Sequence, residues 1–435
     1  MRRFGLMAAA GAAALTSMLG AAPAAHAGGF YLQEQGVRAT GRAYSGEAAD
    51  QGVESLWWNP ASIAGSGTEV YAGVNGILTD GSVTDLGSTL TLPVPPHGLT
   101  LPVGGDPRID HPIENGVAPN LAGAYSFGGR FAVGLSVAGP YNFTTAYPGA
   151  SFTRYDALKS RLFTADGQLT LAMRATSWLD LGVAADAEYS DAKLTNALPN
   201  LVPGAPDGAQ SLTGHGWNWG WTAGAQAHFG AVSLGASYRS AIGHDLKGTV
   251  SAQGLLGPLA AANFVAPGSA HFTTPWIATF GVRYHATDRL TFDAQLQRFG
   301  WSEFSAITVA SPVGVQVLPQ GYRDTTSGAF GLDYDVSPKL TLRTGFQYDP
   351  TPVPQSGPDA RVPDSDRWIL AAGASAKLNR RMTLDAAFAY INFQPATINH
   401  DADFFAGTPA ATSAQTIGAV EGTGYVVSLG FRAAL

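Results

Sequence analysis

Cysteine is absent from the 435 residues of the sequence. This absence excludes disulfide bonds, thiolate nucleophiles and thiolate metal sites. Charge is also scarce, because charged residues make up 13% of the chain, against about 25% in an average globular protein. Beyond the N-terminus no run of about 20 apolar residues occurs, so the sequence offers no transmembrane helix. A long, weakly charged chain without helical spans is typical of a transmembrane β-barrel, whose strands each give a weak signal.

The first 27 residues have the three parts of a secretory signal peptide. Arg2 and Arg3 are followed by an apolar region at 4–19 and by an A-x-A cleavage site at 25–27. We therefore predict that residues 1–27 are removed and that the mature chain begins at Gly28. Removal leaves 23 basic and 32 acidic residues, a net charge of −9. An acidic chain of this kind is a poor binder of nucleic acid.

Residues 28–67 form a stretch of a different kind, rich in Gly, Ala and Ser, with neither a helical nor a strand period. The stretch nevertheless contains five aromatic anchors, which are Phe30, Tyr31, Tyr44, Trp57 and Trp58. Disordered linkers are poor in aromatic side chains, because aromatic area is what ordered packing uses. We predict a compact N-terminal hatch that the rest of the chain surrounds.

Residues 68–435 alternate between apolar and polar side chains with the period of a strand. The clearest segments are 121–127, 131–138, 179–189, 332–336, 340–349, 382–390 and 425–435. One apolar and one charged face fit either a soluble sandwich with its charges outside or a membrane barrel with its charges inside. The connections between the segments distinguish these two structures.

Short and long connections alternate strictly along the chain. Tight turns are predicted near Gly128, Ser177, Gly230, Thr287, Pro338 and Asn379, and long connections at 78–117, 147–159, 196–215, 251–271, 304–320, 351–362 and 399–419. Bacterial outer-membrane barrels have short periplasmic turns and long external loops. The fold class is therefore all-β: a transmembrane antiparallel β-barrel of about 14 strands with the hatch inside its lumen.

Four short motifs occur in the order found in one transporter family. They are Gly41-Arg42-Ala43-Tyr44-Ser45-Gly46 with Asn59-Pro60-Ala61, GWSEF at 300–304, GYRD at 321–324 and PDSDR at 363–367. On these motifs the sequence resembles the FadL-type long-chain fatty acid transporters (OMPP1/FadL/TodX), which are outer-membrane channels for hydrophobic compounds. The resemblance covers the mature chain, and it implies a bacterial outer-membrane location.

The resemblance also implies roles for the hatch. Phe30 matches the position that meets bound ligand, and Asn59-Pro60-Ala61 matches the tripeptide that fixes the hatch to the barrel, with Arg42 and Tyr44 in the preceding hatch motif. An Asn side chain can satisfy backbone groups of the barrel while Pro fixes its own φ angle. An ordinary turn is the alternative interpretation of Asn59-Pro60.

An irregularity at Gly139-Pro140-Tyr141-Asn142 interrupts the strand that alternates up to Ala138. Pro140 has no N–H for a neighbouring strand, and Gly139 permits a kink. A gap in a barrel wall is costly in lipid unless something uses it. Family members are understood to release ligand sideways through such a kink, so we predict a lateral opening at 139–142. The alternative is that the strand ends at Ala138 and a loop begins.

A fatty acid would need a cation for its carboxylate in addition to an apolar groove. Arg323 aligns with a basic residue near the internal site of the family, although an ion pair with Asp324 is an equal alternative. The second carboxylate-binding Arg of the family is replaced by Asn196, and Lys193 is a possible substitute. A neutral aromatic or aliphatic hydrocarbon therefore stays open as the substrate.

The function expected from these observations is passive uptake of hydrophobic compounds, most simply long-chain fatty acids, by a monomer in contact with outer-membrane lipid and lipopolysaccharide. No cofactor, metal site or enzymatic motif is expected, since the nine His lack metal-ligand spacing and no G-x-S-x-G elbow occurs. The alternatives are a general porin and an outer-membrane lipid hydrolase, for which His228, His271 and His285 are the candidate residues.

Overall fold

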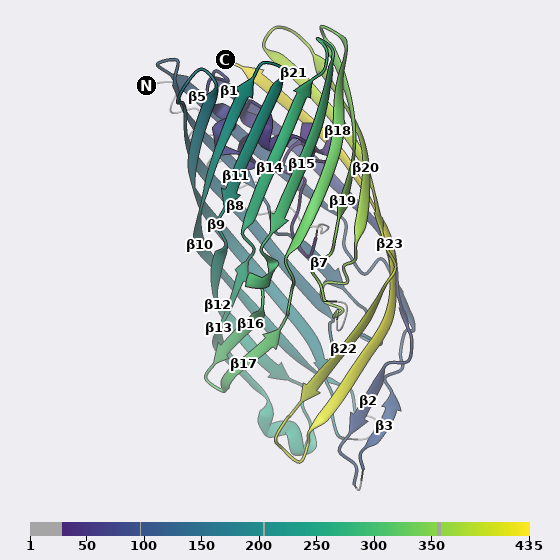
Figure 1. Cartoon of the computed structure of the whole chain (residues 1–435). Coiled ribbons are helices and arrows are strands. Elements are labelled where there is room, and N and C mark those ends of the chain that lie inside the picture. Colours follow the sequence, from purple (N-terminus) through teal and green to yellow (C-terminus); the bar gives the residue numbers. More distant parts are fainter. Residues whose placement is uncertain (1–27, 96, 203–204, 355–357) are drawn as a thin grey trace.

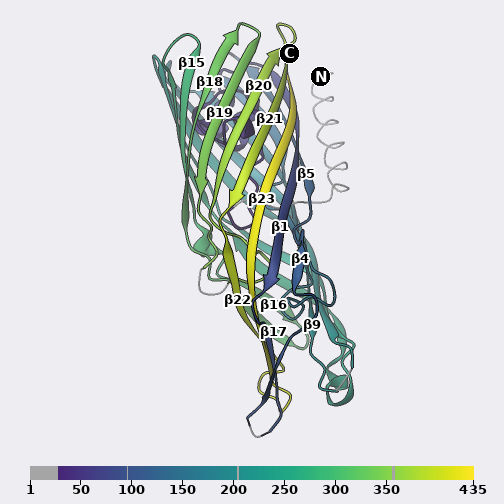
Figure 2. The same ribbon diagram turned by 90° about the vertical axis from the view of Figure 1, so that its right-hand side faces the viewer.

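The computed structural model describes residues 28–95, 97–202, 205–354 and 358–435. Within these residues, fourteen antiparallel strands pair in a closed ring that β1 and β23 complete (Figure 2). The predicted barrel of about 14 strands is confirmed. The ring consists of β1 (Glu69–Asp85), β5 (Gly116–Phe127), β6 (Phe131–Ala138), β8 (Lys159–Arg174), β9 (Leu179–Leu198), β10 (Gly208–Phe229), β11 (Val232–Arg239), β14 (Ile277–His285), β15 (Leu290–Phe299), β18 (Thr325–Ser337), β19 (Leu340–Asp349), β20 (Arg367–Lys377), β21 (Met382–Phe393) and β23 (Thr412–Ala434).

The wall of this ring turns its apolar side chains outward and its charges inward. On β19, Leu342 and Phe346 are 44% and 45% exposed, whereas the intervening Arg343 and Gln347 are 5% and 1% exposed. A soluble sandwich would show the opposite pattern, with the charged face in water. The outer surface of the ring is therefore suited to lipid, as in an outer-membrane barrel.

The short turns lie at one end of the barrel, where the C-terminus also lies (Figure 1). Three residues, Gly128-Gly129-Arg130, connect β5 to β6, whose pairing extends to Phe127↔Phe131. Both glycines have positive φ angles, 61° and 69°, a region that favours glycine. Short turns mark the periplasmic end of an outer-membrane barrel. The described residues contain no helix that is long and apolar enough to span a membrane.

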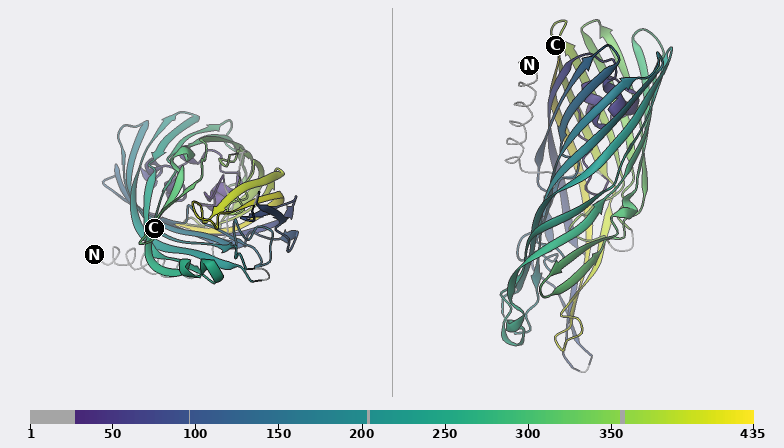
Figure 3. Two further views of the ribbon diagram at one scale, coloured as in Figure 1. Left: turned by 90° about the horizontal axis from the view of Figure 1, so that it is seen from below. Right: turned by 90° about the vertical axis from the view of Figure 1, so that its left-hand side faces the viewer.

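At the opposite end the wall continues beyond the ring in shorter strands (Figures 1 and 3). These are β2 (Thr89–Leu92), β3 (Leu99–Pro102), β4 (Arg108–Asp110), β7 (Phe143–Ala146), β12 (Ile242–Gln253), β13 (Phe264–Thr274), β16 (Ala306–Ser311), β17 (Gly314–Pro319) and β22 (Ala396–Phe404), with the 3-10 helices η4 (Gly257–Ala262) and η5 (Trp301–Glu303). The predicted long connections at 304–320 and 399–419 contain further strands, because β16 pairs with β17 and β22 pairs with β23. Pairing satisfies backbone groups that a loop would leave to water.

The hatch lies inside the ring, where the view along the barrel shows it as the purple segment (Figure 3). Its helical turns are short: α2 (Val37–Gly41), η1 (Glu47–Ala49), η2 (Val53–Trp57) and η3 (Pro60–Ile63). Glycines in the wall let its backbone approach closely. A Cβ at Gly235 would lie 1.8 Å from Ala48 O, and one at Gly345 would lie 2.1 Å from Arg42 O. The hatch is thus seated directly on wall backbone at positions that only glycine allows.

Candidate functional site

Phe30, near the start of the hatch, lies in a pocket of aromatic side chains. Its ring centroid is 4.9 Å from those of Trp301 and Phe304 and 5.9 Å from those of Tyr141 and Phe143. The hatch, the kink region and the segment after β15 all contribute to this pocket. Aromatic rings at these separations pack favourably on one another, and Phe30 fills the space between the other four, so that it is 2% exposed.

The wall is interrupted at the predicted kink. Strand β6 ends where Ala138 pairs with Asp166, and β7 resumes where Phe143 pairs with Leu162. Between these two points the Asn142 amide replaces backbone pairing with β8. Its Nδ2 donates to Thr164 O at 3.3 Å, and its Oδ1 accepts from Thr164 N at 2.9 Å.

On the side that faces β6, part of β5 has no paired strand. The pairing of β5 with β6 ends at Leu121↔Val137, so residues 116–120 pair only with β1. The described wall therefore has a gap between residues 116–120 and the kink residues 139–142. Inside a bilayer the backbone groups at such a gap must be satisfied by other protein groups.

Hatch residues satisfy the groups of the kink. Leu32 N donates to Pro140 O at 2.7 Å, and Gln35 Nε2 donates to Gly139 O at 3.2 Å. Tyr31 forms an isolated antiparallel bridge with Tyr141. The start of the hatch therefore pairs with the kink almost as a strand would.

The same hatch segment also reaches the other edge of the gap. Asn120 Nδ2, on β5, donates to Glu34 O at 3.1 Å, and Asn75 Nδ2, on β1, donates to the same oxygen at 2.9 Å. The segment 32–35 thus bridges the kink and β5 from the lumenal side. Among the described residues, the gap between 116–120 and 139–142 is therefore faced by a hatch segment and not by another strand.

The predicted anchor residue Asn59 connects the hatch to the wall by hydrogen bonds. Asn59 Nδ2 donates to Ala225 O of β10 at 3.0 Å and to Ala48 O at 2.7 Å, while its Oδ1 accepts from Ala61 N at 3.0 Å. Pro60 opens η3 directly after it. This geometry supports the anchor interpretation of Asn59-Pro60-Ala61 over that of a free turn.

Charged hatch residues add ion pairs to this anchoring. The fully buried Arg42 contacts Glu47 and Asp50 of the hatch and also Asp333 of β18, the last at 3.0 Å. Tyr44 donates its hydroxyl to Glu34 at 2.8 Å. Arg42 therefore links hatch to wall, whereas Tyr44 stabilises the hatch internally.

Loosening this anchor should open the barrel to small polar solutes. In Asn59→Leu the Ala225 carbonyl loses the Asn59 donor and Ala61 N loses its acceptor, whereas Ala48 O keeps the Gln226 amide as a donor at 2.9 Å. Each buried group left unsatisfied costs about 1–3 kcal/mol. We expect single-channel conductance in planar bilayers to rise from near zero to a readily measured level. Ser66→Ala, which removes a hydrogen bond to Ile63 O within the hatch, is the matched control and should stay closed. Equal conductance of the two variants would contradict the anchor role.

The two predicted head-group residues do not lie in the Phe30 pocket. Lys193 is exposed on β9, on the outward face that alternates with the buried Ser190. Arg323 is exposed and donates to Thr351 O, while Asp324 pairs with Arg298 and not with Arg323. Neither cation is therefore brought to Phe30.

Asn196, the replacement for the second Arg of the family, lies inside and is 8% exposed. Its Nδ2 donates to Ala197 O at 3.1 Å. The position therefore faces inward with a neutral amide and supplies no charge for a carboxylate.

A different basic residue lies near the hatch, and the sequence analysis did not identify it. Arg239 stacks on Trp57 at 3.6 Å and pairs with Asp186 at 3.0 Å. Asp166 and Glu188 are also buried and lie close enough to Arg239 to interact with it electrostatically. Three carboxyl groups thus surround one guanidinium, which makes this part of the lumen unfavourable for a further carboxylate.

The first residues of the hatch are held by two aspartates, Asp349 at the end of β19 and Asp364 in the PDSDR motif. Gly28 N donates to Asp349 at 3.2 Å, and Gly29 N donates to Asp364 at 2.8 Å. Arg367 pairs with both carboxylates. Burial raises the pKa of Asp364 to about 6 although Arg367 opposes the shift. The pair would gain a second cation if Gly28 carried a free α-amino group.

The hydrolase alternative has one suggestive geometry, at His228. Its Nδ1 lies 3.2 Å from Ser233 Oγ and its Nε2 lies 3.1 Å from Asp180. A serine triad needs the opposite orientation, with Nε2 toward the serine. Asp180 is also held by Arg174 at 2.9 Å. The contacts of His228 are therefore those of hydrogen-bonded side chains on the barrel wall and not those of a catalytic triad.

Comparison with known proteins places the chain in a family. Residues 18–434 match the family described as outer membrane protein transport protein (OMPP1/FadL/TodX). The chain belongs to this family. It is accordingly a multi-pass β-barrel of the bacterial outer membrane, as its resemblance implied.

Two curated members of the family show how far the similarity extends. Outer membrane protein P1 of Haemophilus influenzae is 24% identical over 410 residues, which cover 86% of this chain and 88% of that protein. The long-chain fatty acid transport protein of Escherichia coli K12 is 25% identical over 416 residues, which cover 85% and 89%. The shared length shows that this FadL-type chain corresponds to nearly the whole of each relative.

Solved structures of FadL-type proteins have the same fold. A FadL homologue of Pseudomonas aeruginosa matches with a TM-score of 0.80 at 20% identity and covers 93% of this chain and 99% of its own. The toluene transporter TodX of Pseudomonas putida matches with a TM-score of 0.64 at 18% identity and covers 92% and 98%. These likenesses support the barrel with its internal hatch.

Proposed function

We propose that the protein carries out passive, hatch-gated uptake of hydrophobic compounds across the outer membrane and releases them sideways through the wall. The observation that carries the proposal is the bridging of the wall gap by hatch segment 32–35. Its hydrogen bonds reach Pro140 on one edge and Asn120 on the other. A gap that is filled only by a displaceable segment is suited to gating.

The Phe30 pocket connects ligand binding to that gap. A hydrophobic molecule that enters the pocket competes with the Phe30 ring for contact with Trp301 and Phe304. Displacement of Phe30 moves its sequence neighbours Tyr31 and Leu32, whose contacts with the kink then break. No energy source is needed, because transfer of apolar area from water to the bilayer drives the movement.

Signal-peptide removal would complete the closed state. If cleavage follows Ala27, Gly28 acquires an α-ammonium group beside Asp349 and Asp364. Before cleavage these two carboxylates share the single guanidinium of Arg367. Two cations would then balance two carboxylates, and charge-assisted hydrogen bonds are about twice as strong as neutral ones. The processed hatch is therefore held more firmly at its start than the precursor.

The electrostatics favour a neutral substrate over a carboxylate. Arg323 and Lys193 lie outside the aromatic pocket, and the buried Arg239 is already surrounded by acids. We therefore infer that weakly polar aromatic or aliphatic compounds are taken up best. Long-chain fatty acids are the second candidate, which the name of the Escherichia coli relative favours.

Uptake measurements in cells with and without the gene distinguish these substrates. We expect gene-dependent uptake of a labelled aromatic hydrocarbon, and Arg323→Ala and Lys193→Ala should keep it within about twofold. If the protein takes up fatty acid and one of these variants reduces that uptake about tenfold, the substituted residue binds the carboxylate head group. If uptake of neither compound depends on the gene, the proposed function is wrong.

The porin and hydrolase alternatives have direct tests. A general porin requires large single-channel conductance of the native protein, which the seated hatch opposes. A hydrolase requires release of fatty acid from phospholipid, and the reversed His228 ring opposes it. We propose a monomer that is not an enzyme, whose outward apolar face contacts outer-membrane lipid and lipopolysaccharide.

A further inference from the structure

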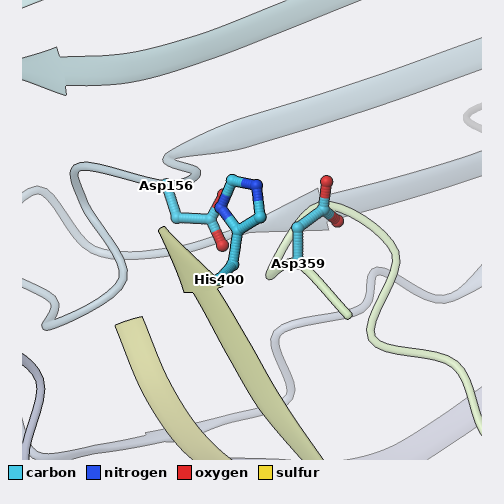
Figure 4. A group of neighbouring side chains, drawn as sticks. All are labelled: Asp156, Asp359 and His400. Atoms are coloured by element: carbon cyan, nitrogen blue, oxygen red, sulfur yellow. The ribbon is translucent and has the colours of Figure 1, made fainter. Parts of the chain in front are cut away.

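Three segments that are far apart in sequence bring two aspartates and a histidine together at the external end of the barrel. Asp156 precedes β8, Asp359 lies between β19 and β20, and His400 lies on β22. One potential ligand atom from each residue lies within 4.8 Å of the others. Figure 4 shows the His400 ring between the two aspartate side chains.

The pair Asp156 and His400 has the geometry of two ligands of one ion. Asp156 Oδ1 and His400 Nδ1 are 3.1 Å apart, yet neither atom has a hydrogen-bond partner of acceptable geometry among the described residues. Asp156 is 1% exposed, so the oxygen that forms this ion pair with His400 faces the cluster and not water. Zinc bonds of about 2.0–2.2 Å place tetrahedral ligand atoms about 3.3–3.6 Å apart.

The other oxygens of the two aspartates are already held by backbone donors. Asp156 Oδ2 accepts from Ala360 N at 2.6 Å, and Asp359 Oδ1 accepts from Arg361 N at 3.0 Å. Such outer contacts orient carboxylate ligands toward a metal. Each aspartate therefore keeps one oxygen for the cluster.

The surrounding charges set the conditions for binding. Arg361 is the other charged group that faces the cluster. Burial lowers the pKa of His400, but the Asp156 carboxylate outweighs this effect and raises the pKa to about 9. A metal must therefore displace the proton of His400, because histidine coordinates as a neutral imidazole. His400 is partly exposed and leaves a path from the external solvent.

We propose that Asp156, Asp359 and His400 form a binding site for a divalent transition-metal cation of the zinc class, which joins three external segments of the barrel. One nitrogen and two carboxylate oxygens, with water in the fourth position, form a ligand set that suits zinc. The three ligand atoms lie within 4.8 Å of one another, so metal binding would draw them together to the spacing of a tetrahedral site. The proposal is independent of the transported substrate.

The test is zinc titration of the mature protein in detergent at pH 8 after removal of metals with a chelator. Calorimetry should show one zinc ion per chain, and Asp359→Asn and His400→Gln should each weaken binding at least tenfold, as loss of a supporting group already does. His271→Gln is the matched control, because His271 contacts only Asp245 at an exposed position. Its affinity should be unchanged.

A second readout separates the metal site from a simple ion pair. Zinc should raise the thermal unfolding midpoint of the native protein and of His271→Gln, but not that of His400→Gln. Zinc binding of equal strength by His400→Gln would overturn the proposal. So would absence of binding by the native protein at about 100 μM zinc, which would leave Asp156 and His400 as an ion pair only.

Discussion

Uptake should fall at least tenfold when the kink is replaced by regular strand, as in the double variant Gly139→Thr with Pro140→Val. Valine restores a backbone N–H that proline lacks, and both new residues favour extended backbone. The strand β6 can then continue toward β7 and pair with residues 116–120 of β5. The gap through which substrate would reach the bilayer is thereby closed.

The barrel itself should survive this change, because the fourteen-strand ring is closed by β1 and β23 on another side. Heat-modifiable migration in gel electrophoresis checks folding, and a labelled hydrocarbon measures uptake. Asn142→Asp is a matched variant that keeps the acceptor for Thr164 N but loses the donor to Thr164 O. Full uptake by the folded double variant would rule out lateral release.

Much of the fold can be predicted from local pattern. Along β19 the alternation of Leu342 and Phe346 with Arg343 and Gln347 reports which face is buried, and the turn at Gly128-Gly129 reports where a strand reverses. These signals are local in sequence, so they need no knowledge of the tertiary structure. The hairpin β16–β17 was placed within a long connection, because each of its strands has only six residues.

The site depended more on tertiary contacts, and there local reasoning failed in two ways. Lys193 was named as a possible substitute for the missing Arg, although the inward series Asp186, Glu188 and Ser190 already places odd-numbered positions of β9 outside. The contact of Leu32 with Pro140 could not be predicted at all. Nothing in either segment specifies a partner about a hundred residues away, and only barrel closure brings the two together.

The absence of cysteine permits a direct test of hatch movement. Tyr31 and Tyr141 form an antiparallel bridge, and bridged residues have Cα atoms about 4.5–5.5 Å apart. That spacing lies within the range that a disulfide spans. In the double variant Tyr31→Cys with Tyr141→Cys, oxidation should therefore fix the start of the hatch to the kink.

Oxidised protein should lose at least nine-tenths of its uptake, because a fixed hatch cannot leave the wall gap. Addition of a reductant should restore uptake in the same cells, which separates locking from the loss of two tyrosine rings. The single variants Tyr31→Cys and Tyr141→Cys are the controls and should not respond to oxidant. If the oxidised double variant transports as well as its reduced form, the substrate passes without displacement of this segment, and the hatch does not gate the wall.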